Sequence, residues 1–207
     1  MKGKMMKKIF YSTVFAAVLA GSGVAGATEV KGLPNPDLSQ SSPALMELLN
    51  TRQSVRSYDR EKTIDDQTLS EILWAANGVN KRGTRTIATA RNEQNLKVYV
   101  LSTDGIWFYN AADNQLEKIS DENAIGFTAE QQPFVLDAPI HLIYTSSDKR
   151  WGHDHAGSAY QNVYLYATAK GLATVIRGLI NTEELHRALN LNDDEFVIVH
   201  QPIGYPK

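Results

Sequence analysis

The apolar positions from residue 43 onward follow two spacings, one typical of helices and one typical of strands. The clearest helical stripe consists of Leu69, Ile72, Leu73 and Ala76, and it predicts a helix over Asp65–Val79 that Asp65 caps and that ends near Gly78. Three more helices are predicted: Pro43–Asn50, with Ser42 as N-cap and Pro43 at the first helical position; Ser158–Lys170, closed by Gly171; and a helix that Asn181 or Thr182 caps and that ends near Leu189.

Strands are predicted where apolar and polar residues alternate or where β-branched residues gather. Leu96–Ser102 alternates, while Ile106–Asn110 and Gln115–Ile119 predict a hairpin around Ala-Ala-Asp-Asn. The remaining predicted strands are Pro139–Thr145, Leu172–Ile176 and Glu195–Gln201. Helices mixed with strands and hairpins indicate an α+β fold. The helix over Ser158–Lys170 is apolar on nearly all sides, which predicts a place at the centre of the core or at a subunit interface.

The first 27 residues have the three parts of a secretory signal peptide. Four lysines precede an apolar run over Ile9–Ala20, and Ala25-Gly26-Ala27 supplies a cleavage site. The stretch GSGVAG at 21–26 matches the dinucleotide-binding pattern G-x-G-x-x-G, but it would leave with the signal instead of following a strand. We therefore expect export to the periplasm or beyond, an extended leader over residues 28–42, and one domain over residues 43–207.

The charge of the exported part narrows the possible partners. Once the four signal lysines are removed, 17 basic side chains remain against 23 acidic ones, a formal charge of −6. This disfavours nucleic acid and anionic lipid surfaces as partners. The sequence has no cysteine, which excludes disulfides and a lipoprotein anchor. No later apolar run approaches the ~20 residues that span a bilayer, so a soluble exported domain is expected.

Arg52, Ser54 and Arg56 occupy alternate positions directly after the first predicted helix. In extended backbone alternate side chains share one face. Two guanidiniums beside a hydroxyl could bind a phosphate or a carbonyl that gains negative charge. The alternative is a solvated arginine-rich turn.

Two further segments could face a ligand. Asn92 and Gln94 come just before the strand over Leu96–Ser102, and their carboxamides both donate and accept, which suits the uracil-like edge of a flavin. Gly178 follows Arg177 and would allow another group to approach the backbone closely. Ordinary turn chemistry is the alternative for the first segment, and a loop glycine is the alternative for the second.

The histidines do not indicate a metal site. His153 and His155 flank Asp154, but the other histidines lack paired spacing, so we interpret this stretch as a solvated loop with Asp154 near a helix start. His141 and His200 lie within apolar strands and are predicted to be core residues with satisfied partners.

Taken together and in this order, these segments resemble the FMN-dependent nitroreductase family. The resemblance is carried by R-x-S-x-R-x-Y at the start, by NGVNKRG and TARNEQ in the middle, and by SAYQNVYLYATAKGLATVIRG. The hairpin DGIWFYNAADNQLEKI and the ending Ile203-Gly204-Tyr205-Pro206 are most similar to the branch that contains azoline dehydrogenases of peptide-modifying systems. The resemblance extends over Ala44–Lys207.

The resemblance implies an intertwined homodimer with a mostly antiparallel central sheet, two FMN sites at the interface, and the helix over Ser158–Lys170 in the dimer core. The implied cofactor contacts are Arg52, Gln53, Ser54 and Arg56 to the phosphate, ribityl chain and pyrimidine edge; Asn92 and Gln94 to the ring; and the backbone of Ile176, Arg177 and Gly178 near N5. Many members hold the phosphate with a basic residue near the end of the chain, a role that falls here to Lys207 or to Arg52 and Arg56 with help from Arg85 or Arg91.

The implied chemistry is hydride exchange at flavin N5 with a small organic substrate such as a nitroarene, a quinone or an azoline. Arg56 or Arg52 would stabilise the charge of the reduced ring. NAD(P)H is the usual reductant of the family, but its scarcity outside the cytoplasm favours oxidase or dehydrogenase chemistry or another electron source. Substrate specificity is expected in residues 121–157, which contain Phe127, Phe134 and Trp151.

Two other functional classes remain open. The chain could be a non-catalytic exported protein that binds flavin or another small ligand. It could also be an interaction module without cofactor, which the pair of arginines around Ser54 disfavours.

Overall fold

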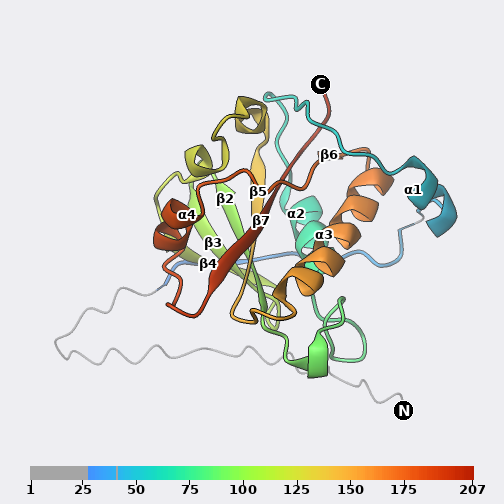
Figure 1. The fold of residues 1–207 in the computed structure, drawn as a ribbon. Coiled ribbons are helices and arrows are strands. Elements are labelled where there is room, and N and C mark those ends of the chain that lie inside the picture. Colours follow the sequence, from blue (N-terminus) through green and yellow to red (C-terminus); the bar gives the residue numbers. More distant parts are fainter. Residues whose placement is uncertain (1–27, 41) are drawn as a thin grey trace, which may run out of the picture.

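A seven-stranded antiparallel sheet forms the centre of the molecule (Figure 1) in the computed structural model, which describes residues 28–40 and 42–207. The strands follow the order β1 (Val30–Gly32), β4 (Gln115–Ser120), β3 (Gly105–Asn110), β2 (Leu96–Ser102), β5 (Ile140–Ser146), β7 (Phe196–Gly204) and β6 (Ala173–Thr174). The α+β class predicted from the sequence is confirmed. The predicted signal peptide, residues 1–27, lies outside the described residues.

Helices cover both faces of this sheet. In Figure 1, α2 (Asp66–Asn77) and α3 (Gly152–Ala169) lie on one side, while α4 (Thr182–Ala188) and the 3-10 helices η2 (Ile125–Thr128) and η3 (Pro133–Asp137) lie on the other. Alternation along β2 sends Val98 and Val100 into the core under α2 and α3, and Tyr99 and Leu101 into the core under α4. The sheet is therefore buried on both faces.

The ends of α2 follow the local signals in the sequence. Asp65 accepts a hydrogen bond from the backbone N–H of Thr68 at 2.8 Å, which caps the helix as predicted. At the other end, a Cβ on Gly78 would lie 2.4 Å from Cδ1 of Trp74, so glycine is required there by the close approach of that side chain.

The starts of two other helices differ from the prediction. α1 (Leu45–Thr51) begins after Ala44, and no side chain caps this end, so Ser42 and Pro43 do not take the positions predicted for them. α3 begins at Gly152 instead of Ser158, so the stretch interpreted as a solvated loop is helical. The Asp148 carboxylate accepts from the N–H groups of Arg150 and Trp151 and forms a turn that starts the helix six residues early.

The strand predicted over Leu172–Ile176 is reduced to β6, which pairs with the end of β7. After Thr174 the chain leaves the ladder and returns to it only at Arg177, which exchanges backbone hydrogen bonds with His200. Of the two residues between these points, Val175 is buried and Ile176 is partly exposed.

The predicted leader belongs to the fold. Its residues 30–32 pair with β4 as the outermost strand, and residues 34–40 then cross α2. The buried Glu71 carboxylate holds this crossing: it accepts from the Asp37 N–H and from the side chains of Gln40, Gln67 and Tyr166, with Lys170 Nζ at 3.4 Å. We call residues 30–40 the N-terminal strap.

None of the helices in the described part of the chain is long and apolar enough to cross a membrane.

Candidate functional site

We call the segment with Arg52, Ser54 and Arg56 the arginine clamp. The clamp and the segment around Gly178 meet at one side chain, Tyr164 of α3. The Arg52 guanidinium lies 5.0 Å from the centre of the Tyr164 ring, and Ser54 Oγ is hydrogen-bonded to the Tyr164 hydroxyl at 2.9 Å. The same hydroxyl accepts the backbone N–H of Ile176 at 2.8 Å. Segments 110 and 12 residues away from Tyr164 are therefore fixed at one point, which we call the Tyr164 node.

The alternation predicted for this segment is present in its first half. The side chains of Arg52 and Ser54 both contact Tyr164. The backbone N–H of Val55 donates to the Thr174 carbonyl of β6. Gln53 and Arg56 are exposed to solvent. The clamp is thus an extended segment docked beside β6 with two of its polar side chains on the protein and two directed outward.

Beyond the node, the backbone of residues 176–179 presents an open face. Gly178 is exposed, and a Cβ placed on it would meet no atom within 4 Å. Its φ lies outside the left-handed region, so the backbone does not need glycine there. Among the described residues no acceptor faces the Gly178 N–H. The segment therefore offers a free donor and space for a ligand.

Behind this open face, the Arg177 side chain turns into the protein and is 6% exposed. Its guanidinium donates to the Gln132 side chain at 2.7 Å, to the carbonyls of Thr128 and Leu179 at 2.6 and 2.9 Å, and to His200 Nδ1 at 3.2 Å. Arg177 therefore ties the 176–179 segment to β7 and to the chain between η2 and η3.

The two predicted core histidines continue this chain of hydrogen bonds. Because the Ala138 carbonyl can only accept, His141 carries its proton on Nε2, and its Nδ1 accepts from His200 Nε2 at 2.9 Å. His200 Nδ1 is then left to accept from Arg177. Burial lowers the pKa of His141 to about 4 and that of His200 well below its usual value, so both rings are neutral. The expectation of satisfied core histidines is confirmed.

The second candidate segment lies elsewhere. Asn92 and Gln94 have positive φ angles of 56° and 53°, as does Arg91 with 52°, in a loop that contains η1 (Ala90–Asn92). His155 holds this loop: its Nε2 accepts from the Ala90 N–H at 2.8 Å, and its Nδ1 donates to the Asn95 side chain at 3.2 Å. Three left-handed residues without glycine in one short loop are strained, a feature that clusters at functional sites.

Within one chain, the two sets of candidates lie at different levels of α3. His155 and Tyr164 are nine residues apart, about two and a half helical turns. Figure 1 shows the loop with η1 below the start of α3, whereas α1 and the segment after it lie beside its end. The structure brings together Arg52, Ser54 and the 176–178 segment, and it does not bring Asn92 and Gln94 to them.

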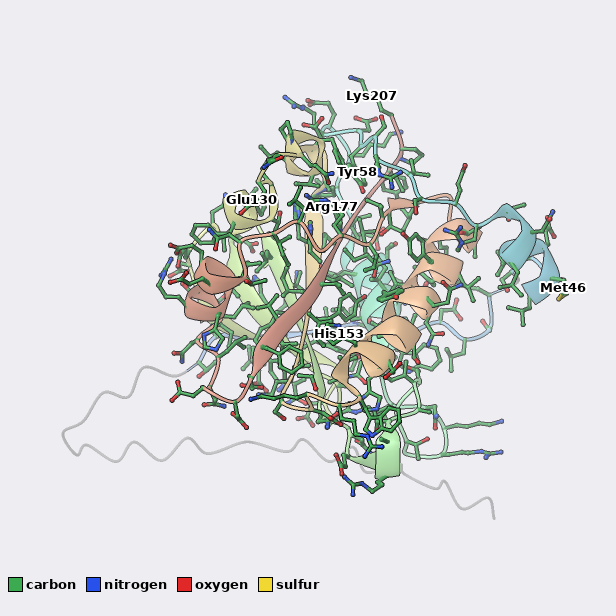
Figure 2. All side chains as sticks on the ribbon, in the orientation of Figure 1. Met46, Tyr58, Glu130, His153, Arg177 and Lys207 are labelled. Atoms are coloured by element: carbon green, nitrogen blue, oxygen red, sulfur yellow. The ribbon has the colours of Figure 1, made fainter. Side chains whose placement is uncertain are left out.

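Lys207 lies at the same end of the molecule as the clamp. Figure 2 shows it above Tyr58 and Arg177. The Asp59 N–H donates to the Tyr205 carbonyl at 2.9 Å, which places the end of the chain beside the residues that follow Arg56. Lys207 itself is exposed.

The comparisons with known proteins agree with this architecture. The Nitroreductase family matches residues 49–205. A relative from Methanocaldococcus jannaschii, named as a putative nitroreductase, is 31% identical in an alignment of 190 residues that covers 82% of this chain and 93% of the relative. The chain belongs to the nitroreductase family.

Two solved structures illustrate the same fold. One from Ralstonia eutropha, also named as putative, has a TM-score of 0.79 with 33% identity and covers 86% of this chain and 90% of its own. The Escherichia coli microcin synthetase complex contains a chain with a TM-score of 0.63 and 16% identity, covering 84% of this chain and 77% of that one. The second likeness concerns the fold alone.

Sequence reasoning missed the residues that organise this nitroreductase site. The sequence pattern places Tyr164 in an apolar helix and His155 in a loop, although each fixes a candidate segment. Tyr58 is a third: it is buried, its ring stacks on Phe134 at 6.4 Å, and burial raises the pKa of its hydroxyl, which donates to the Val55 carbonyl. For Tyr164 and His155 the available signal was a tyrosine or histidine in the chain that forms α3, and for Tyr58 it was the last position of R-x-S-x-R-x-Y.

The three aromatic residues of the stretch expected to determine substrate specificity, residues 121–157, lie in three different places. Phe134 lies between Tyr58 and the Arg177 guanidinium, which is 5.6 Å from its ring centre. Trp151 lines an open hollow of about 760 Å³ together with Ala90, Asn95 and their neighbours, next to the strained loop. Phe127 packs near α4 under Arg187. Phe134 is thus near the Tyr58–Arg177 end, and Trp151 is near the Asn92 loop.

Proposed function

We propose that this nitroreductase-family protein is an exported, FMN-dependent oxidoreductase that works as a homodimer and exchanges hydride with a small organic molecule such as a nitroarene, a quinone or an azoline. The observation that carries the proposal is the Tyr164 node. It holds together Arg52, Ser54 and the 176–178 backbone, three elements that the family resemblance assigns to the cofactor.

The described residues fit FMN on three counts. The free Gly178 N–H and the empty space at its Cα suit the polar edge of a flat ring. Ile176 and Leu179 beside it are partly exposed apolar side chains, with Leu179 41% exposed, which suits the ring face. Arg52 and the exposed Arg56 supply guanidiniums for phosphate or carbonyl oxygens.

When bound, FMN would supply hydride transfer at N5, and the chain would bind and orient it. Arg52, Arg56 and Lys207 would hold the phosphate end, with Gln53 and Ser54 beside the ribityl chain. The Gly178 N–H would donate to the ring, and Ile176 and Leu179 would exclude water from one side of it.

Two features support a homodimer with sites at its interface. The Asn92 and Gln94 loop lies two and a half turns of α3 from the Tyr164 node, so a second chain is a natural source of the missing polar groups. α1 also exposes Leu45, Met46 and Leu49, at 59%, 75% and 47%, an apolar surface that a partner would cover. Figure 2 shows Met46 pointing away from the rest of the chain.

The proposal also concerns the class of substrate and the source of electrons. The azoline-dehydrogenase resemblance rests on the β3–β4 hairpin and on the ending at Gly204–Pro206, and it favours dehydrogenase chemistry on a modified peptide. NAD(P)H, the usual reductant of the family, would supply electrons in a compartment that contains it. The export predicted from residues 1–27 favours another source of electrons.

The spectrum of the protein purified from the periplasm tests this proposal. We expect a dimer with a flavin absorbance band near ~450 nm, or one that acquires the band on incubation with FMN. Bleaching under anaerobic conditions by NADPH, NADH or dithionite, followed by recolouring with a nitroarene or a quinone, would establish turnover. A coloured protein that never reoxidises with these acceptors would be a flavin-binding protein without this activity, and a colourless monomer would exclude FMN binding.

Substitution of Gly178 by alanine separates binding from folding. The added methyl group meets nothing in the chain, so thermal stability should be unchanged or slightly higher, by up to ~1 kcal/mol. FMN affinity should fall at least about tenfold, because the methyl group occupies the space of the ring. Isothermal titration with FMN and a thermal melt measure the two effects. Gly32→Ala, which also meets no atom within 4 Å but lies in β1, should bind FMN like the wild type.

A further inference from the structure

The Tyr164 hydroxyl donates its proton to Ser54. Its oxygen already accepts the backbone N–H of Ile176 at 2.8 Å. Tyr164 is 6% exposed, so its proton needs an acceptor within the protein. Among the described residues, the acceptor within hydrogen-bond distance is Ser54 Oγ at 2.9 Å. A phenol is also a better donor and a poorer acceptor than an alcohol. The hydrogen bonds therefore run in one direction, from Ile176 through Tyr164 to Ser54.

Ser54 keeps its own proton for another group. A serine hydroxyl has one proton and two lone pairs, and Tyr164 uses one of the lone pairs. The Ser54 side chain forms no other hydrogen bond with the described residues, and it is partly exposed. Each hydrogen bond in such a chain polarises the next one and strengthens it. Ser54 therefore offers a strengthened donor to a group that lies over the arginine clamp.

The two arginines of the clamp have the same polarity, because a guanidinium can only donate. Neither Arg52 nor Arg56 forms an ion pair with another described residue. The Arg52 guanidinium lies over the Tyr164 ring, and Arg56 is exposed. The clamp thus carries three side chains that donate, and no carboxylate of the described residues neutralises its two charges. Phosphate and carbonyl oxygens, which carry no proton, match this arrangement.

We propose that Tyr164 is a positioning residue: its hydroxyl holds Ser54 as a donor, and the clamp therefore prefers a ligand oxygen that accepts and carries no proton. The inference rests on the proposed function, in which the ligand is FMN. Two kinds of FMN oxygen have this chemistry, those of the phosphate and the two carbonyl oxygens of the pyrimidine ring. Tyr164 acts on either of them through Ser54.

Titration of variants with FMN tests this role. Ser54→Ala should lower the FMN affinity of the wild type at least about tenfold, because it removes a donor to an acceptor oxygen. Tyr164→Phe keeps the ring that Arg52 covers. It should lower the affinity about fivefold, since the Ser54 hydroxyl is then free to turn. In the Tyr164→Phe background, Ser54→Ala should cost less than about threefold, because the two hydroxyls act as one unit.

Two further variants separate this role from a purely structural one. Ser54→Thr keeps the hydroxyl and should retain most of the affinity, a comparison with Ser54→Ala that does not depend on whether Tyr164→Phe folds. Tyr109→Phe is the matched control, because it also removes a buried hydroxyl, one that donates to Asn114 at 3.0 Å beside the β3–β4 turn. It should lose thermal stability and bind FMN like the wild type.

Riboflavin, which lacks the phosphate, identifies the oxygen. If Ser54 holds the phosphate, Ser54→Ala should leave the riboflavin affinity nearly unchanged; if Ser54 holds a ring carbonyl, the affinities for both flavins should fall together. In a wild type that binds FMN, losses from Ser54→Ala and Tyr164→Phe that multiply independently would overturn the inference alone, as would equal losses in Ser54→Thr and Ser54→Ala. A wild type that takes up no FMN would overturn the proposed function together with it.

Discussion

Replacement of Glu71 by alanine is expected to remove about 3–5 kcal/mol from the free energy of unfolding. The carboxylate is 5% exposed and accepts from the Asp37 backbone and from three side chains, with Lys170 Nζ nearby. These donors come from the N-terminal strap, α2 and α3, and alanine would leave all of them without this acceptor. Hydrogen bonds also keep the pKa of Glu71 below its usual value against the effect of burial, so the group is charged at neutral pH.

Denaturation in guanidinium chloride measures the loss. Glu183→Ala, which removes an exposed carboxylate from the first turn of α4, should cost less than about 1 kcal/mol. Glu71→Ala should also release the N-terminal strap, so limited proteolysis of this variant is expected to cut between residues 36 and 42 before it cuts the rest of the domain. An intact strap together with a full loss of stability would show that Glu71 acts on the helices alone.

Acidification should unfold the protein through its buried histidines. The folded-state pKa of His141 is about 4 against an ordinary value of 6.5, because burial opposes the charged ring and Arg177 already supplies a positive charge. The unfolded chain therefore binds the proton first. The contribution of the neutral histidine to the free energy of unfolding is fully present above pH 6.5. For each histidine, the free energy of unfolding falls by up to about 1.4 kcal/mol per pH unit as the pH is lowered toward 4.

His200 adds a contribution of the same sign, since its pKa lies well below the usual value. Denaturant midpoints at several pH values between 7 and 5 would measure the combined slope; the pKa values of the buried carboxylates of Glu71 and Glu195 are lowered from 4.5, so these groups lose their stabilising effect below this window. In His141→Gln the slope should decrease by one proton, because the amide can accept from His200 and donate to Ala138 without titrating. The exposed His153 is the control, and His153→Gln should keep the wild-type slope.

The sequence predicted the features of this fold that depend on neighbouring residues. The Asp65 cap, the alternation along β2 and the hairpin of β3 and β4 all arise from residues a few positions apart. The strand β1 was missed because its three residues are held by pairing with β4, 85 positions further along. The early start of α3 was missed although its cause is local, because the turn at Asp148 continues directly into the helix across a stretch that has no apolar helical stripe.

The same distinction between local and long-range features applies to the candidate site. The residue types of the clamp and of the 176–178 segment could be recognised from their spacing and from the family resemblance. Their meeting at Tyr164 could not, since it joins residues 110 positions apart through a hydroxyl that a hydrophobic pattern treats as core. The buried charge of Arg177 was likewise invisible, because the sequence does not tell whether an arginine has a carboxylate beside it.

The strap also limits how this protein can be shortened. A form trimmed to the family match at residue 49 lacks β1, so the outer N–H and C=O groups of Gln115, Leu116 and Glu117 become a bare sheet edge. Such an edge is a template for strands of other molecules. The shortened protein would therefore tend to aggregate edge to edge, and a loss of solubility in it would reflect the missing cover on β4 and not a defect in the residues around Tyr164.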